Sequence, residues 1–91
     1  MWKISYTRKV ERQIAKLHKQ VRGALDALMT DIKIAGPVRG NWPNYSKLSA
    51  GRHHCHLKGG HPTYVAVWEE ADNTIKLVRI TYAGTHENAP Y

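Results

Sequence analysis

Along the first 36 residues, the spacing of apolar positions changes from a strand pattern to a helix pattern. Residues 2–7, "WKISYT", alternate in polarity and contain β-branched and aromatic side chains, which predicts a strand. After Thr7, which suits a helix N-cap, apolar residues recur at helical spacing in two sets. The sets are Val10, Ile14, Leu17 and Val21, and then Ala24, Leu25, Leu28, Met29 and Ile32. We expect a helical hairpin with a tight turn at residues 18–20, or one helix kinked at Gly23, ending at Gly36-Pro37.

The remaining residues predict a loop followed by three strands. Residues 36–51 are rich in Gly, Pro, Asn and Ser, so we expect a loop there. Strand-like segments follow at 52–58, 63–70 and 74–83, with turns expected at 59–62 and 71–73. The order β-α-α-β-β-β predicts an α+β fold for residues 1–91, in which the hairpin packs on a four-stranded sheet.

Length and composition favour one small globular domain. The chain has 91 residues, of which 42% are hydrophobic, so a single domain with a small core is expected. No apolar run approaches the roughly 18 residues that cross a membrane, and residues 1–17 contain no signal-peptide-like stretch. A lone cysteine, Cys55, cannot form an internal disulfide. We therefore expect a cytoplasmic protein with no membrane partner.

Positive charge gathers near the start of the chain. Fourteen Lys and Arg residues oppose seven Asp and Glu residues, and seven of the cations lie in the first 22 residues beside one acid, Glu11. Arg8, Arg12 and Lys16 belong to this group. A cluster of this kind favours a polyanion or an acidic protein as partner, although a solvated helix face remains an alternative.

Histidine is concentrated in residues 52–61, "RHHCHLKGGH", which hold four of the six histidines. Because side chains alternate along a strand, one set should face away from the core and the other toward it. The outward set is Arg52, His54, His56 and Lys58, and the inward set is His53, Cys55 and Leu57. The expected exposed face therefore carries two imidazoles between two cations.

Several chemistries could use this face. His54 and His56 could bind zinc with His61 or His86, but Arg52 and Lys58 would repel a dication. Cys55 alternates away from these histidines, which disfavours a Cys–His nucleophile. A polar strand without chemistry remains open. In the fourth alternative, histidines exchange protons with a phosphodiester while Arg and Lys stabilise the charge, and neither metal nor cofactor is needed.

Two pieces carry a resemblance to a known family. "RHHCHLKGGHPTYVAVWE" resembles the second and third strands of RelE-like toxins, and "YAGTHENAPY" resembles the Gly-Thr-His ending of their mRNA-cleaving branch. The whole chain is similar to the RelE/ParE superfamily of bacterial type II toxin–antitoxin modules. The resemblance implies a mainly antiparallel sheet, a cognate antitoxin that forms a hetero-oligomer with the toxin, and an endoribonuclease that cuts mRNA on the ribosome. A ParE-like gyrase poison and a non-catalytic binding module are the alternatives.

The resemblance also implies roles for individual residues. The expected catalytic residues are Arg52, His54, His56 and His86. The expected substrate-binding residues are Lys58, His61 and Tyr91, and the positive charge near the start of the chain adds Arg8, Arg12 and Lys16 to them. Many RelE-like toxins have an arginine in the third strand, where this chain has Thr63-Tyr64-Val65. Phosphate stabilisation would then depend on Arg52 and Lys58.

Overall fold

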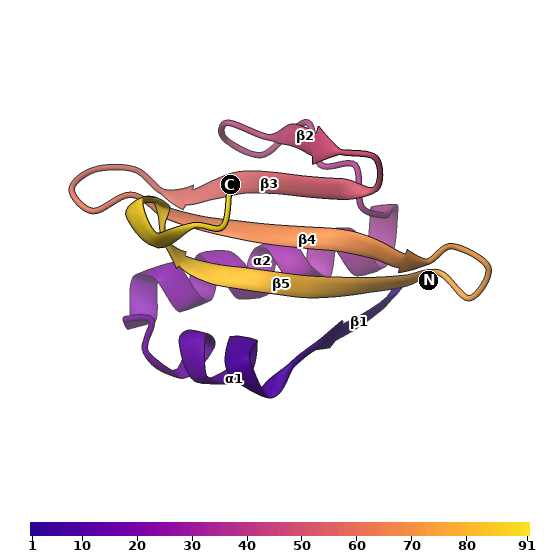
Figure 1. The fold of residues 1–91 in the computed structure, drawn as a ribbon, viewed down its shortest axis with the longest axis horizontal. Helices are drawn as coiled ribbons and strands as arrows, with labels where there is room; N and C mark the ends of the chain where they lie inside the picture. The colour runs from indigo at the N-terminus through magenta and orange to yellow at the C-terminus, as the bar shows by residue number, and fades with distance from the viewer.

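The computed structural model describes residues 1–91 as an α+β fold in which helices cover one face of a sheet (Figure 1). The elements are β1 (Lys3–Tyr6), α1 (Arg8–Ala15), α2 (Lys19–Ala35), β2 (Ser46–Ser49), β3 (Arg52–Lys58), β4 (Tyr64–Asp72), β5 (Leu77–Thr85) and a 3-10 helix (His86–Asn88). The predicted α+β fold is confirmed, but the sheet has five strands rather than four. None of the helices is long and apolar enough to cross a membrane.

The fifth strand, β2, lies inside the segment expected to be a loop. The strand order is β1-β5-β4-β3-β2, and every pair is antiparallel except β1 with β5. β2 has four residues and pairs only with β3, where Ser46 opposes His54. Turn-forming residues surround it, so its own sequence gives little strand signal. Pairing with β3 creates this strand, and the loop prediction was wrong there.

The helix break lies slightly earlier than predicted. The Thr7 side chain caps α1 by accepting a hydrogen bond from the Val10 N–H at 3.3 Å. α1 ends at Ala15, and α2 begins at Lys19 and continues through Gly23. The break therefore falls at residues 16–18, not 18–20, and Val21 belongs to the second helix. Gly36, with φ at +96°, ends α2, and a Cβ there would lie 3.0 Å from the indole of Trp2.

The last hairpin also turns later than predicted. β4 extends to Asp72, and the turn occupies residues 73–76 rather than 71–73. The Asp72 carboxylate accepts hydrogen bonds from the backbone N–H groups of Thr74 and Ile75, at 2.9 and 3.4 Å. The side chain of the residue before the turn thus stabilises it, and β5 begins at Leu77.

Two apolar clusters lie on opposite faces of the sheet. The larger, between helices and sheet, contains 13 buried residues, including Trp68, whose indole N–H donates to the Pro37 carbonyl at 2.9 Å. The smaller contains Val65, Val67 and Tyr82, with Leu48 and Ala89 packed against it. Figure 1 shows the last residues passing in front of the sheet and ending over β3. The C-terminal segment thus covers part of the face that the helices leave open.

Candidate catalytic site

An open depression of about 540 Å³ lies where the β3–β4 turn meets the end of β5. Its lining residues are His56, Gly60, His61, Pro62, Thr63, His86 and Glu87. Three histidines that are far apart in the sequence therefore share one surface. His56 comes from β3, His61 from the following turn, and His86 from the 3-10 helix.

Backbone pairing places His86 beside His56. In the β4–β5 ladder Tyr64 opposes Thr85, and the next N–H, that of His86, donates to the Thr63 carbonyl at 2.8 Å. The imidazoles of His56 and His86 meet edge to face, with ring centroids 5.7 Å apart. The structure thus brings together the two pieces of sequence that carry the resemblance.

The environment of His56 favours its neutral form. The pKa of His56 is lowered from its ordinary value of 6.5, first by burial and then by the neighbouring imidazoles of His86 and His54. Burial removes water that would stabilise the imidazolium, and each neighbouring ring disfavours a further positive charge. At neutral pH a neutral His56 can accept a proton, as a general base must.

His54 was expected on an exposed face, but the structure buries most of it. Its residue exposure is only 9%, because β2 lies beside it and Tyr91 lies over it. Nδ1 of His54 is 3.0 Å from Oγ of Ser46, and the rings of His54 and Tyr91 meet with centroids 4.8 Å apart. Tyr91 also meets His86 edge to face at 5.8 Å. Tyr91 therefore contacts imidazoles from both pieces of the site.

The two cations of β3 do not line the depression. Arg52 opposes Glu69 at the other end of the strand, and Glu69 forms an ion pair with Arg79 at 2.9 Å. Arg52 and His56 are four positions apart, which corresponds to about 13 Å along a strand. Lys58 follows an irregularity in the β3–β4 pairing that lies between His56 and Lys58. Imidazoles, not guanidinium or ammonium groups, therefore line the depression.

The predicted cations of α1 and Lys16, the residue that follows it, separate into two groups. Arg8 and Arg12 line a depression of about 490 Å³ on α1 itself, together with Glu11 and Ala15. Lys16 lines a different depression, of about 340 Å³, which also includes Thr85 and Asn88 on either side of the His86-Glu87 pair. Of the three cations, the structure brings only Lys16 toward the segment that carries His86.

Two known structures have a similar arrangement of helices and strands. Neither models of known protein families nor curated protein sequences match the chain. The crystal structure of the isolated E. coli RelE toxin is similar with a TM-score of 0.72 over 99% of this chain and 89% of that chain, at 13% identity. The chain has the RelE toxin fold. A chain of the archaeal RelE–RelB complex from Pyrococcus horikoshii is also similar, with a TM-score of 0.63 over 97% and 98% of the two chains, at 10% identity.

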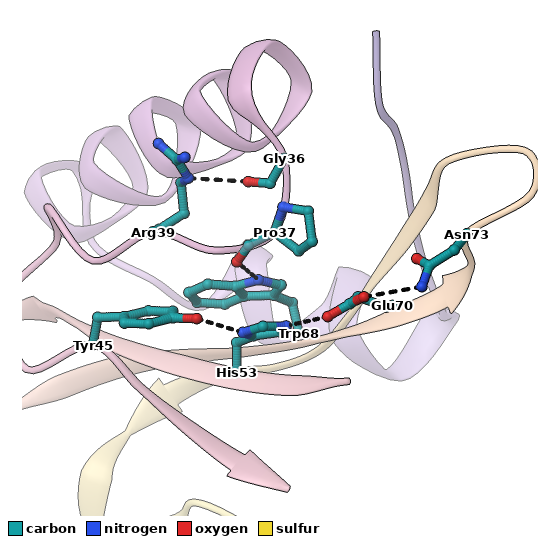
Figure 2. A network of polar contacts seen from close by, with 8 residues as sticks. All are labelled: Gly36, Pro37, Arg39, Tyr45, His53, Trp68, Glu70 and Asn73. Atoms are coloured by element: carbon teal, nitrogen blue, oxygen red, sulfur yellow. Dashed lines mark hydrogen bonds and ion pairs between the residues drawn. The ribbon is translucent and has the colours of Figure 1, made fainter. Parts of the chain in front are cut away.

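The helix-covered face of this RelE-like sheet contains a polar network that the sequence analysis missed (Figure 2). His53 is fully buried, and its ring stacks at 5.8 Å on both Tyr45 and Trp68. Its Nε2 lies 2.7 Å from the Glu70 carboxylate, and its Nδ1 lies 2.7 Å from the Tyr45 hydroxyl. Asn73 donates a further bond to Glu70 at 3.0 Å. In the sequence, the only sign of an acidic partner for His53 was Glu70, which ends the apolar strand segment 63–70.

Hydrogen bonds in this network stabilise the ionised form of Glu70. The bond from His53 is the main cause that lowers the pKa of Glu70 from its ordinary value of 4.5. An ionised carboxylate only accepts, so Nε2 of His53 donates to Glu70, and Nδ1 pairs with the Tyr45 hydroxyl. Both ring nitrogens are then satisfied, and His53 has a structural role in the RelE-like fold.

The structure gives little support to a Cys55 nucleophile or to a metal site. Burial raises the pKa of the Cys55 thiol to about 12, so almost no thiolate forms at neutral pH. No group of three or more His, Cys, Asp or Glu side chains is arranged to hold a metal ion. Glu87 is exposed and also lines the depression.

Proposed function

We propose that this chain is the toxin of a bacterial type II toxin–antitoxin module, and that it inhibits translation by ribosome-dependent endonucleolytic cleavage of mRNA. The observation that carries the proposal is the edge-to-face pair of His56 and His86, whose centroids are 5.7 Å apart and which both line an open depression. The RelE toxin fold supports the same function. The proposed chemistry is histidine acid–base catalysis without a metal or cofactor.

In the proposed reaction, His56 is the base and His86 is the acid. Neutral His56 removes the proton from a ribose 2′-hydroxyl, and the 2′-oxygen attacks the adjacent phosphorus. Protonated His86 gives its proton to the 5′-oxygen as the phosphorus–oxygen bond breaks. The products are a 2′,3′-cyclic phosphate and a free 5′-hydroxyl. The lowered pKa of His56 supports its assignment as the base.

The remaining candidate residues bind RNA in this proposal. Tyr91 offers a ring on which a base can stack, a contact worth about 1–3 kcal/mol. His61 lines the depression and can contact the reacting phosphate. Arg52 and Lys58 lie outside the depression, so they suit phosphates on either side of the one that is cut.

We assign the exposed cations of α1 and its C-cap to a polyanionic or acidic partner. Arg8, Arg12 and Lys16 are exposed, and none forms an ion pair in this structure. Their fields would guide the chain to ribosomal RNA or to an acidic segment of a cognate antitoxin. Such binding weakens steeply as salt increases.

Induced expression followed by mapping of mRNA 5′ ends tests the proposal. Wild-type chain should arrest growth and cut mRNA in a ribosome-containing extract. His86→Ala should abolish both effects, whereas His18→Ala, a matched change at an exposed histidine outside the depression, should keep them. Full activity of His86→Ala contradicts the assignment. Growth arrest with intact mRNA would favour gyrase inhibition, and neither effect in wild type would favour a binding module.

A further inference from the structure

β2 and the residue before it contact two adjacent histidines from opposite faces of the sheet. The Tyr45 hydroxyl lies 2.7 Å from Nδ1 of His53, on the helix-covered face. The Ser46 hydroxyl lies 3.0 Å from Nδ1 of His54, on the other face. Because side chains alternate along β3, consecutive residues of one segment can each reach one of two consecutive imidazoles.

Two oxygen atoms of Ser46 approach the same ring nitrogen. Besides Oγ at 3.0 Å, the Ser46 carbonyl oxygen lies 3.4 Å from Nδ1 of His54. A carbonyl oxygen can only accept a hydrogen bond, whereas a hydroxyl can accept or donate. Both contacts are favourable together only when Nδ1 carries the hydrogen. The neutral ring then has a free lone pair on Nε2.

The other nitrogen of His54 has no hydrogen-bond partner within the chain. Both hydrogen bonds of the ring involve Nδ1, while its neighbours across space are the rings of His56 and Tyr91, with centroids at 6.2 and 4.8 Å. Nε2 is therefore the nitrogen that remains for a ligand at the site. With Nδ1 protonated, Nε2 accepts a hydrogen bond and does not donate one.

We propose that Ser46 is a positioning residue, which holds His54 as the Nδ1–H tautomer so that Nε2 accepts a hydrogen bond from a hydroxyl or N–H group of the RNA. The effect on cleavage rests on the proposed function, whereas the tautomer itself does not. Tyr45 contributes indirectly. Its bond to His53, which Glu70 holds in turn, fixes the start of β2 and hence the position of Ser46.

Nitrogen NMR of histidine-labelled protein tests the tautomer directly. Long-range proton–nitrogen correlation above the titration range should show His54 with Nδ1 protonated, and the spectrum of His54→Gln identifies its signals. Ser46→Ala should reduce the Nδ1–H population, because it removes the shorter contact at 3.0 Å and leaves only the weaker one at 3.4 Å. Ser46→Thr should restore it. An Nε2–H tautomer in wild type, or a tautomer unchanged by Ser46→Ala, overturns the proposal.

Cleavage kinetics separate this inference from the proposed function. Ser46→Ala should lower kcat/KM about 3- to 10-fold, in line with the loss of one hydrogen bond, and Ser46→Thr should recover it. Ser49→Ala is the matched control, because Ser49 lies on the same strand and its side chain forms no hydrogen bond. If wild type does not cut mRNA, the proposed function fails and the NMR result still decides the role of Ser46. If wild type cuts and Ser46→Ala cuts equally fast, the positioning role fails alone.

Discussion

His53 and His56 lie three residues apart on β3 and have opposite environments. His53 faces the helices, is fully buried, and has both ring nitrogens occupied by Tyr45 and Glu70. His56 faces away from the helices, is half-buried, forms no hydrogen bond to its ring, and lines an open depression beside His86. A ring with both nitrogens satisfied stabilises the fold. A ring with free nitrogens and a lowered pKa can exchange protons with a substrate.

The largest expected effect concerns His56. His56→Ala should lower the rate of mRNA cleavage about 10²- to 10⁴-fold, because removal of a general base costs that much. The midpoint of thermal unfolding should change little, since His56 forms no side-chain hydrogen bond in the structure. Primer-extension rates and a thermal melt measure the two quantities. A variant that unfolds much earlier but still cuts at full rate would reverse the proposed division between the two histidines.

His53 should show the opposite behaviour. His53→Ala should lower the free energy of unfolding by about 2–5 kcal/mol, because it leaves a cavity and removes two buried hydrogen bonds. In a chain of this size each 1 kcal/mol corresponds to about 4–8 °C in the unfolding midpoint. Urea unfolding measures the change, with His61→Ala as the control at an exposed histidine. Equal stability of the two variants would mean that the network does not stabilise the fold.

The third prediction concerns Tyr91, which lies on the face of the sheet that the helices leave open. Tyr91→Ala should weaken RNA binding by about 1–3 kcal/mol through loss of stacking, and Tyr91→Phe should preserve binding. The measurement is the KM for mRNA cleavage or the affinity for a short RNA bound by the His56→Ala variant. A Tyr91→Phe variant as weak as Tyr91→Ala would assign the effect to the hydroxyl group and not to the ring.

The smallest expected effects concern the pH dependence of stability, which should differ between the two faces of the sheet. The lowered pKa of His56 means that the unfolded chain binds its proton first, so stability is lost as pH falls below about 6.5. The lowered pKa of Glu70 gives a second loss as pH falls below about 4.5. His56→Ala should remove the first loss and Glu70→Gln the second, as measured by urea unfolding from pH 8 to pH 3. One variant that removed both losses would argue against independent faces.

Local sequence determined most of the secondary structure. Period-3.6 spacing gave two helices, and period-2 spacing gave four of the five strands, with boundary errors of a few residues. Alternation along residues 52–58 correctly placed His53 and Cys55 toward the core and His56 away from it. These features follow from spacing alone because helix and strand repeats decide which side chains share a face.

Tertiary structure alone decided the details of the site. β2 forms because it pairs with β3, and this pairing places Ser46 beside His54 and buries a ring that was expected to be exposed. Strand length places Arg52 far from His86, although both belong to the predicted catalytic set. The bond between His53 and Glu70 joins residues 17 positions apart. Contacts between distant residues depend on the register of strands, and no local repeat in a sequence records that register.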